Sequence, residues 1–454
     1  MAEKKLNINS EEYIFKEVRD YSIELATERS IPSVIDSFKD SQRKAVFIMQ
    51  NKRDYIKTVS VAGEMISANI YLHGDVSAAN SISLMAAPYL NNRCIFEGKG
   101  TFGTRVAPDA FASPRYTYVK PSKFMSDFIL TDKNIIPMKE NYDGSVLEPQ
   151  YYLPLIPLVL LNGVNGIAVG WSTNILPHSL KDIIKECINE LDGKKVHNLK
   201  PHYDYLNNIN FKQEENRYEF YSSVEKLSDT VFKIKELAPG LKLEKVIEIL
   251  DKLEDDGVIS GYEDNTRDII DISIFCKRGT NYSVEEIIEK CKLISREAER
   301  LVVVDFDGKS IKQYPDHISL IKNFVKFRIK YFYTRYNKFI DDNNKELAFL
   351  NLYKSCYENG LPKEFSKVKS KKELLEKISS YNPKGNNINN INNKDIEKIS
   401  ELPSYKWIEE SYNDVLDKIK ELEDENKKYK EIISSEDNIK KQYKLELEGL
   451  LQLK

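Results

Sequence analysis

The sequence predicts an α+β protein with several domains, and three observations support this fold class. Short apolar runs at helical spacing fill the first third of the chain, helical and strand-like runs alternate in the middle, and long helical repeats fill the end. A chain of 454 residues accommodates two to four domains, at roughly 100–200 residues each. We therefore expect domains at residues 1–150, 151–316 and 317–454.

The first domain is expected to contain a helix-turn-helix element. Helical runs cover residues 42–49 and 58–70, and a third run begins at Asp75 and ends before Pro88. Asp75 is a suitable N-cap residue and directly follows a glycine. Two short helices joined by a tight glycine-containing link are typical of a helix-turn-helix.

The second domain is expected to mix strands and helices. We expect strands at residues 230–234, 269–275 and 301–306, and helices at residues 181–191, 242–253 and 284–299. The segment Val302–Gly308 ends in Asp305-Phe-Asp307-Gly308, which resembles a metal-binding D-x-D sequence. It also fits a β-hairpin turn. We favour the turn, so the sequence predicts no metal site in this chain.

The third domain is expected to be two long helices around a helical middle. Leu320, Phe324, Phe327 and Tyr331 are spaced at helical intervals. A heptad seam from Ile408 to Ile433 then has one polar member, Asn426. An Asn-rich loop at residues 386–393 is expected at the tip. This pattern predicts a long antiparallel coiled coil whose end forms a homodimer contact, or alternatively a helical hairpin packed on its own protomer.

Composition and charge are those of a soluble globular protein. The chain is 41% hydrophobic and 31% charged, with a formal net charge of −3. Residues 29–123 hold 13 Lys/Arg against 7 Asp/Glu, a surplus that suits a phosphate-rich partner or an ordinary solvated surface. The five cysteines form no C-x-x-C pair, which favours a reducing compartment. The chain start is polar, and residues 152–161 are too few to span a membrane. We therefore expect a cytoplasmic protein.

Arg115 and Tyr116 are the candidate catalytic pair. A tyrosine phenol has a pKa of about 10 and is a poor nucleophile without help. A neighbouring Arg can orient a phosphate and stabilise developing charge on it. The same dipeptide also occurs at Arg217–Tyr218 and at residues 335–336, so the dipeptide alone does not identify a site.

The surroundings of Tyr116 carry a resemblance to type IIA DNA topoisomerases. Residues 29–44 (RSIPSVIDSFKDSQRK) resemble the family's R-A-L-P-x-x-x-D-G-L-K-P-V-x-R-R block, and residues 112–117 (ASPRYT) look like its A-A-x-R-Y-T active-site block. Three further blocks are similar to family motifs in the same order: HGD (73–75), EGKGTFG (97–103) and LNGVNGIAVG (161–170). Within this family, the layout resembles the separate, short cleavage subunit of phage members, of the gyrase A and topoisomerase IV A type.

The resemblance implies a winged-helix DNA-cleavage domain, a mixed α/β tower domain and a coiled coil with a helical C-gate. Tyr116 would attack a DNA phosphate and become linked to its 5′ end, while Arg115 would polarise that phosphate. The resemblance further implies these DNA-binding residues: Arg29, Lys39, Arg43, Lys44, His73 and Ile167. Ile167 would insert between base pairs and bend the DNA. Taken alone, Ile167 would be read as a core residue and His73 as a surface residue.

The sequence departs from the family pattern at several neighbours of these residues, among them Asp40-Ser41, Leu72, Ser37 and Tyr118. Ser37 replaces a family glycine, and Tyr118 stands where an acidic residue is usual. Tyr118 is the second candidate nucleophile.

Cofactors are expected on a partner subunit. The glycine-rich residues 98–103 lack the P-loop order, and no other ATP-binding motif is found. The resemblance therefore implies that Mg²⁺ and ATP bind to an ATPase/metal-binding topoisomerase subunit that joins this chain on double-stranded DNA. No DNA-wrapping β-domain is recognised, so we expect relaxation and decatenation rather than introduction of supercoils.

Three alternatives remain open at this stage. A tyrosine recombinase also uses Arg, His and Tyr, but it requires H-x-x-R and a tyrosine near the C-terminus. A non-catalytic DNA scaffold of the same fold would not need the Tyr116 hydroxyl. A structural coiled-coil protein would not bind duplex DNA even at low salt.

Overall fold

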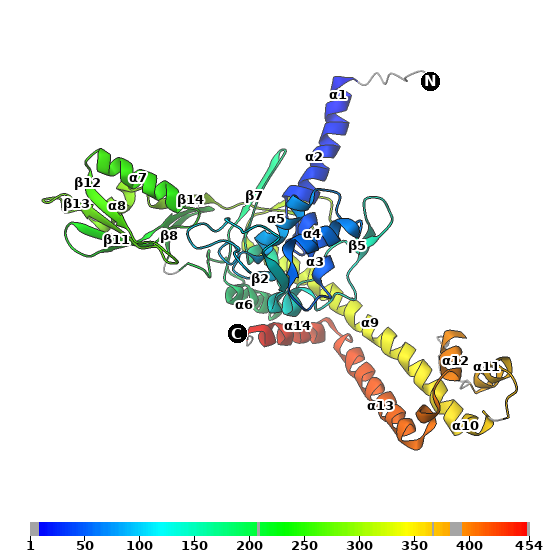
Figure 1. Cartoon of the computed structure of the whole chain (residues 1–454). Helices are drawn as coiled ribbons and strands as arrows, with labels where there is room; N and C mark the ends of the chain where they lie inside the picture. The colour runs from blue at the N-terminus through cyan, green and yellow to red at the C-terminus, as the bar shows by residue number, and fades with distance from the viewer. Residues whose placement is uncertain (1–8, 207–208, 366, 382–392, 452–454) are drawn as a thin grey trace. The chain divides into compact units, whose positions relative to one another are not determined.

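The computed structural model describes residues 9–206, 209–365, 367–381 and 393–451 (Figure 1). The chain forms two compact units. The first comprises Met1–Phe327 and Leu447–Lys454, and the second comprises Arg328–Glu446. Within the described part of the chain, no helix combines the length and the apolar character needed to cross a lipid bilayer.

The first unit begins with a largely exposed helical segment. It consists of α1 (Ser10–Glu12), wider π-type turns over Tyr13–Val18, α2 (Arg19–Leu25) and further π-type turns over Ala26–Ser30. Ala26 is buried at its end and joins a small core cluster with residues of the strand at 301–304. The segment therefore connects to the body of the unit mainly through its last turn.

Three helices pack around an apolar core close to the N-terminus. They are α3 (Asp40–Met49), α4 (Thr58–Ser67) and α5 (Asp75–Ala86). Their buried apolar residues recur at helical spacing, which confirms the three helices predicted from the sequence. One detail of the prediction was wrong. Gly74 occupies the N-cap of α5 and Asp75 is its first helical residue, where a carboxylate favours the positive end of the helix dipole.

A small antiparallel sheet lies beside these helices. Its strand order is β1 (Ile56–Lys57), β3 (Tyr118–Pro121) and β2 (Phe96–Lys99). Strand β1 leads directly into α4, and β3 follows the Arg115–Tyr116 loop. The sheet therefore fixes both ends of the segment that carries the candidate nucleophile.

Two antiparallel pairs of strands and a helix follow. Strands β4 (Met138–Glu140) and β5 (Leu147–Pro149) pair with each other, after a π-type turn at Met125–Ile129 and before a 3₁₀ turn at Leu158–Leu160. Strands β6 (Val164–Ala168) and β7 (Trp171–Ile175) form a hairpin. Helix α6 (Leu180–Leu191) then packs with Ile183, Ile184 and Cys187 buried.

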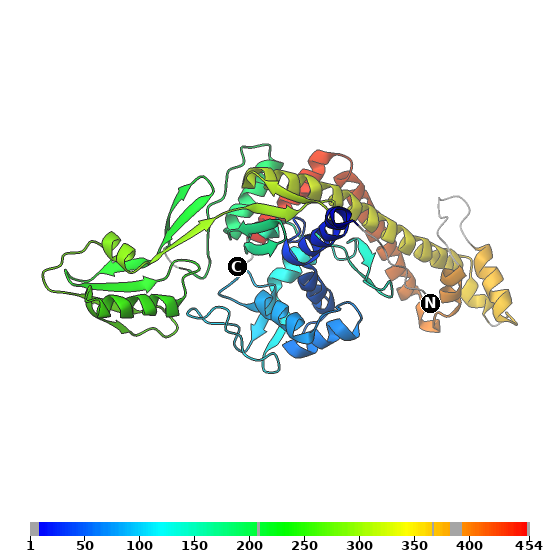
Figure 2. The same ribbon diagram turned by 90° about the horizontal axis from the view of Figure 1, so that it is seen from above.

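The middle of the chain forms two antiparallel sheets. One has the order β10 (Ser223–Lys226), β11 (Val231–Glu236), β13 (Ile272–Cys276) and β12 (Ile259–Asp264). Helix α7 (Leu243–Asp255) lies along this sheet (Figure 2), and with α8 (Val284–Lys290) it covers a shared apolar core. The second sheet has the order β14 (Ile294–Ala298), β9 (Arg217–Tyr221) and β8 (Asn210–Glu214).

The predicted helix at residues 284–299 was wrong in its second half. Helix α8 ends at Lys290, and Lys292 has a positive φ of 50°. A left-handed residue ends a helix. Residues 294–298 instead form β14, which pairs with β9. The strands predicted near residues 231, 272 and 301 are confirmed.

The hairpin of β15 (Leu301–Val304) and β16 (Ile311–Tyr314) confirms the predicted turn at Asp307 and Gly308. The Asp307 carboxylate accepts hydrogen bonds from the backbone N–H groups of Lys309 and Ser310, both at 2.9 Å. Strand β15 also holds the distant segment before α3. The N–H of Val34 donates to the carbonyl of Val304, and the N–H of Val304 donates to that of Pro32.

The second unit is helical. Helix α13 (Glu409–Ile432) lies wholly within this unit. The 42-residue helix α9 (His317–Glu358) enters it at Arg328, and α14 (Glu436–Leu451) leaves it after Glu446. The remaining helical elements are α10 (Leu361–Glu364), α11 (Lys371–Ser380), α12 (Asn393–Ser400) and a 3₁₀ turn at Ser404–Trp407.

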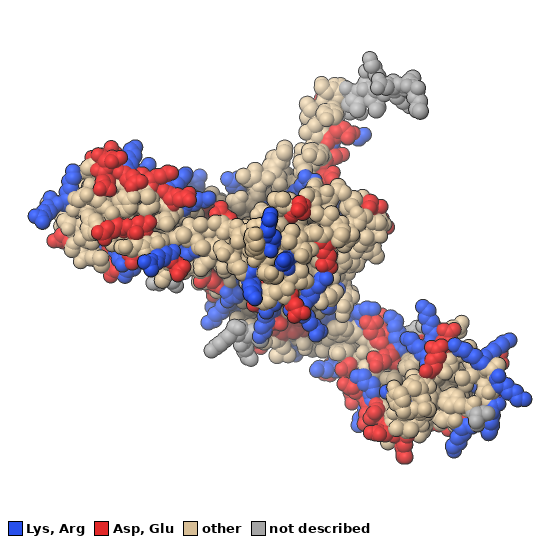
Figure 3. Space-filling view, viewed as in Figure 1, with Lys and Arg blue, Asp and Glu red and all other residues tan. Residues whose placement is uncertain are grey.

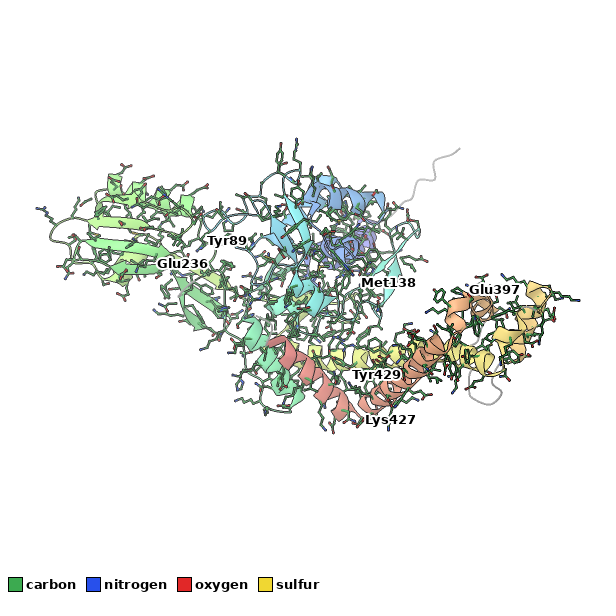
Figure 4. All side chains as sticks on the ribbon, turned by 60° about the horizontal axis from the view of Figure 1, so that its bottom comes forward. Tyr89, Met138, Glu236, Glu397, Lys427 and Tyr429 are labelled. Carbon is green, nitrogen blue, oxygen red and sulfur yellow. The ribbon has the colours of Figure 1, made fainter. Side chains whose placement is uncertain are left out.

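Helices α9 and α13 pack antiparallel. Tyr429 contacts Tyr336 and Phe339, and Asn426 donates to Asn344 at 3.0 Å. Figure 4 labels Tyr429 beside Lys427 on α13. The predicted seam is therefore buried at its middle, where Asn426 finds a polar partner. The predicted tip loop at residues 386–393 lies almost wholly outside the described residues.

Candidate functional site

Tyr116 lies on a loop that is fixed at both of its flanks. The N–H of Thr58 donates to the Thr117 carbonyl at 2.9 Å, and the N–H of Val59 donates to the Pro114 carbonyl at 3.2 Å. The hydroxyls of Thr58 and Thr117 also form a buried hydrogen bond of 2.8 Å. The first turn of α4 therefore holds the loop on both sides of Arg115 and Tyr116.

The side chains of Arg115 and Tyr116 are exposed to solvent. Tyr116 has 70% of its surface exposed, and the Arg115 guanidinium lies 5.9 Å from the centre of its ring. The other two tyrosines that follow an arginine, Tyr218 and Tyr336, are 3% and 5% exposed. Of the three Arg-Tyr pairs, only the one at Tyr116 presents a hydroxyl to a large substrate.

Four of the predicted DNA-binding residues line one cavity. Arg29, Lys39, Lys44 and His73 lie around a cavity of about 540 Å³ at the start of α3 and before α5. Arg29 and His73 are exposed, and the ring of His73 packs edge-on against Tyr71. The structure thus brings together residues that are up to 44 positions apart in the sequence.

The cavity also contains carboxylates that sequence reasoning missed. Glu24, Glu28 and Asp40 are among its lining residues. Burial lowers the pKa of Lys44, but Asp40 at 2.8 Å and Glu148 at 3.4 Å outweigh it, and the net pKa is raised. Burial lowers the pKa of Lys39. Arg29 therefore offers this cavity its most accessible cation.

Arg43, for which the resemblance implies a DNA contact, does not line this cavity. Its guanidinium is buried and donates to both carboxylate oxygens of Asp36, at 2.8 and 2.9 Å, and to the carbonyl of Phe38 at 2.9 Å. Asp36 also accepts from the N–H groups of Phe38 and Tyr152. These hydrogen bonds occupy the guanidinium of Arg43 inside the protein. Arg43 therefore stabilises the segment that carries Lys39 and Lys44.

Ile167 projects from the β6–β7 hairpin. It is 81% exposed, and Val169 at the tip is 63% exposed. Large apolar side chains at the end of a hairpin are costly in water unless a partner covers them. Ile167 is therefore not the core residue that it would be taken for in isolation. Sequence reasoning missed Val169 and also Trp171, which is 40% exposed; their apolar character at the Gly170 turn was the available signal.

The base of this hairpin is anchored beside Arg29. A Cβ on Gly166 would lie 2.2 Å from the carbonyl oxygen of Ser30, so only glycine allows this approach. Lys39 donates from its Nζ to the Asn165 carbonyl at 3.3 Å. The hairpin therefore adjoins the basic cavity, while Arg115 and Tyr116 do not line the cavity.

The charged side chains of the first unit are unevenly distributed. In Figure 3, acidic side chains gather along α7, which carries Glu244, Glu248 and Asp251 among others. Close to the basic cavity, Arg43 pairs with Asp36, and Lys44 pairs with Asp40 and Glu148. A local role in binding phosphate therefore depends on individual side chains rather than on a broad basic surface.

A further cluster of possible metal ligands lies elsewhere in the unit. Among the residues that the structure describes, His178, Glu299 and His317 form the only group of three or more His, Cys, Asp or Glu that could hold an ion. The sequence predicted no metal site, and it gave no signal for this group. Its members are too far apart in sequence for any spacing motif. None of them lines the cavity with Arg29, and no such group includes residues of the Tyr116 loop.

The chain as a whole matches the DNA-cleaving subunits of type IIA topoisomerases. Residues 29–448 match the family model that describes the A subunits of DNA gyrase and topoisomerase IV, and the chain belongs to this family. The resemblance and the function predicted from the sequence motifs are thereby confirmed. Enzymes of this type generally use Mg²⁺ and ATP, and the cleavage subunit works with a partner subunit.

Similar proteins come from a phage, a bacterium and a eukaryote. The DNA topoisomerase medium subunit of Enterobacteria phage T4 is 30% identical over 428 residues, which are 88% of this chain and 93% of that protein. This similarity confirms the predicted phage-type layout. The A subunit of DNA gyrase from Haemophilus influenzae is 33% identical over 196 residues, or 42% of this chain and 22% of that protein.

The same fold occurs in a solved structure of the Plasmodium falciparum topoisomerase II DNA-binding, cleavage and re-ligation domain. The TM-score is 0.84 at 24% identity, and the match covers 97% of this chain and 64% of that chain. The architecture is therefore shared over nearly the whole of the present chain, including the mixed α/β middle.

Proposed function

We propose that this chain breaks and rejoins DNA through Tyr116, as the cleavage subunit of an ATP-dependent type IIA topoisomerase. The observation that carries the proposal is the exposed hydroxyl of Tyr116 on a loop fixed by Thr58 and Thr117. Preorganisation of this kind lowers the entropic cost of bringing a nucleophile to its target. The family motifs around the loop support the assignment of DNA as the substrate.

The proposed reaction is a transesterification. The oxygen of Tyr116 forms a bond to a backbone phosphorus, the bond from phosphorus to the 3′ oxygen breaks, and the proton leaves the phenol as the 3′ hydroxyl forms. The product is a 5′-phosphotyrosine, and reversal of the step rejoins the strand without ATP. Arg115 would orient the phosphate and stabilise charge on its oxygens.

The basic cavity and the hairpin would hold the DNA around the break. Arg29, Lys44 and His73 would contact phosphates, Lys39 would join them from the base of the hairpin, and Ile167 would insert between base pairs. An apolar side chain that unstacks a step holds a bend in the duplex. The exposed tip of β6–β7 supports this role, because its apolar surface has no cover in the described chain.

The helical part and its small sheet would act as a winged-helix domain, within residues 1–150. Residues 151–316 would form the tower, and the antiparallel α9–α13 pair would act as a coiled coil whose end forms a homodimeric gate. Two copies of Tyr116 would then cleave opposite strands. Relaxation and decatenation would follow from strand passage through the break, in the cytoplasm.

Mg²⁺ and ATP would be held by the partner subunit. The described residues around Tyr116 contain no group of three carboxylates, histidines or cysteines close enough to hold a cation. Bound Mg²⁺ would supply charge stabilisation for the transferred phosphate. This chain contributes the nucleophile, the arginine beside it and the surface that positions the duplex.

The experiment is a covalent trapping assay. The chain, an ATPase/metal-binding partner, Mg²⁺ and end-labelled plasmid are mixed and quenched with denaturant. We expect protein attached to 5′ ends with the wild type and with Tyr118→Phe, and none with Tyr116→Phe. Attachment to 3′ ends would indicate a recombinase-like enzyme. Loss of the covalent product in Tyr118→Phe, with Tyr116→Phe still active, would reassign the nucleophile. DNA binding without any covalent product would indicate a scaffold.

A further inference from the structure

Three buried side chains from distant segments meet in the first unit. His178 follows β7, Glu299 follows β14, and His317 begins α9. Their exposed fractions are 0%, 6% and 4%, and one possible ligand atom from each lies within 4.8 Å of the other two. All three residues belong to the same compact unit.

The surrounding backbone leaves one ligand atom of His178 and one of Glu299 available. Nδ1 of His178 lies 2.9 Å from the carbonyl of Leu160, so this nitrogen carries the proton and donates. Its Nε2 then keeps a lone pair. Oε1 of Glu299 accepts from the N–H of Leu176 at 3.0 Å, which leaves Oε2. Histidines that bind metals usually donate their other ring N–H to a carbonyl or carboxylate in this way.

The cluster is incompletely satisfied by its own hydrogen bonds. Nε2 of His178 and Nε2 of His317 are both buried without a hydrogen-bond partner in the described structure. Nε2 of His317 lies 3.2 Å from Oε2 of Glu299, which is an ion pair only when the imidazole is protonated. A buried polar atom without a partner is unfavourable, and a cation between the three atoms would satisfy them all.

We propose that His178, Glu299 and His317 bind one Zn²⁺. Two imidazole nitrogens and one carboxylate oxygen form a common three-residue zinc set, with water as the fourth ligand. Mg²⁺ prefers oxygen ligands in octahedral geometry, so this site is distinct in its chemistry from a magnesium site. A cavity of about 430 Å³ lined by Glu299 and His317 gives an ion access to the cluster.

The ion would brace the hairpin that carries Ile167. It would connect the chain just after β7 to the end of β14 and the start of α9. Asn174 of β7 already exchanges two backbone hydrogen bonds with Arg300, next to Glu299. Zinc would add a second attachment a few residues further on, at His178. This role is structural and does not depend on the nucleophile assigned to Tyr116.

The first test uses the full-length wild-type chain. After loading with Zn²⁺ and dialysis against metal-free buffer, we expect one zinc ion per chain by mass spectrometry. Chelation should lower the unfolding temperature by a few degrees, and Zn²⁺ but not Mg²⁺ should restore it. Co²⁺ in place of Zn²⁺ should give the visible absorption of a four-coordinate nitrogen and oxygen site.

The second test uses variants with a matched control. Glu299→Gln and His317→Gln should each weaken zinc binding by at least about 100-fold. His202→Gln should leave it unchanged, because His202 is exposed and pairs with Asp204 instead. If a variant does not fold, the wild-type readouts decide.

Three results would overturn the proposal. A zinc content far below one ion per chain, with no response of the unfolding temperature to Zn²⁺, would show a cluster that works without metal. Thiolate bands in the Co²⁺ spectrum would place the ion on cysteines. Full zinc binding by folded Glu299→Gln and His317→Gln would place it elsewhere.

Discussion

Replacing Arg43 with alanine should destabilise the segment around α3. The guanidinium makes three hydrogen bonds, two to Asp36 at 2.8 and 2.9 Å and one to the Phe38 carbonyl at 2.9 Å. Removing one member of a buried ion pair costs about 3–5 kcal/mol, because the other charge stays buried. Asp36 keeps two backbone N–H donors, from Phe38 and Tyr152. We therefore expect the lower end of this range, about 3 kcal/mol.

Hydrogen exchange is the suitable assay, since a chain with two compact units need not unfold in one step. A loss of about 3 kcal/mol should speed exchange of the most protected α3 amides roughly 100-fold. Arg29→Ala is the control, because Arg29 is exposed, and it should change stability by less than about 0.5 kcal/mol. Unchanged exchange in Arg43→Ala, together with weaker DNA binding, would refute the reasoning and return Arg43 to the DNA surface.

Three other predictions follow from backbone and charge. Ser37→Gly should raise stability by about 0.5–1 kcal/mol in thermal unfolding, because Ser37 has a φ of 64°; a lower melting temperature would contradict this. Gly166→Ala should displace the hairpin, because its Cβ would lie 2.2 Å from the Ser30 carbonyl oxygen. We expect at least about tenfold less trapped covalent complex. Gly63→Ala is the control and should leave the amount of complex unchanged, because open space surrounds Gly63. Burial lowers the pKa of Lys39, so its charge is lost as pH rises through a pKa below 10.5. DNA affinity should therefore fall between neutral pH and 10.5, and Lys39→Gln should flatten that dependence; parallel curves would exclude a phosphate contact.

Elements that depend on local pattern could be predicted from the sequence. Helices α3, α4 and α5 follow from apolar residues at helical spacing, and the β15–β16 turn follows from Asp307 and Gly308. The segment after Lys290 could not be predicted in the same way. Its strand β14 forms because β9, about 75 residues earlier, offers a partner edge. Tertiary pairing thus overrode the local helical pattern.

In the candidate site, too, the sequence predicted residue types but not their burial or their partners. Sequence motifs made Tyr116, Arg29 and Ile167 candidates by residue type and order, but exposure is a property of the folded chain. Burial separates Tyr116 from Tyr218, although both follow an arginine. Arg43 has the charge that a DNA contact needs, but its guanidinium forms a buried ion pair with Asp36. The histidine cluster had no sequence signal, since its members come from three separated segments.

The pairing of the segment before α3 with β15 has a consequence for synthesis. Val304 accepts a hydrogen bond from the N–H of Val34, 270 residues earlier, and donates one to the carbonyl of Pro32. At about 5–20 residues per second, a ribosome needs roughly 15–50 seconds to make the second partner after the first. During this interval the segment between Arg29 and Lys39 lacks β15, the strand with which it forms hydrogen bonds. The surface proposed to bind DNA can therefore be completed only late in translation, and factors that shield nascent chains should matter most for this stretch.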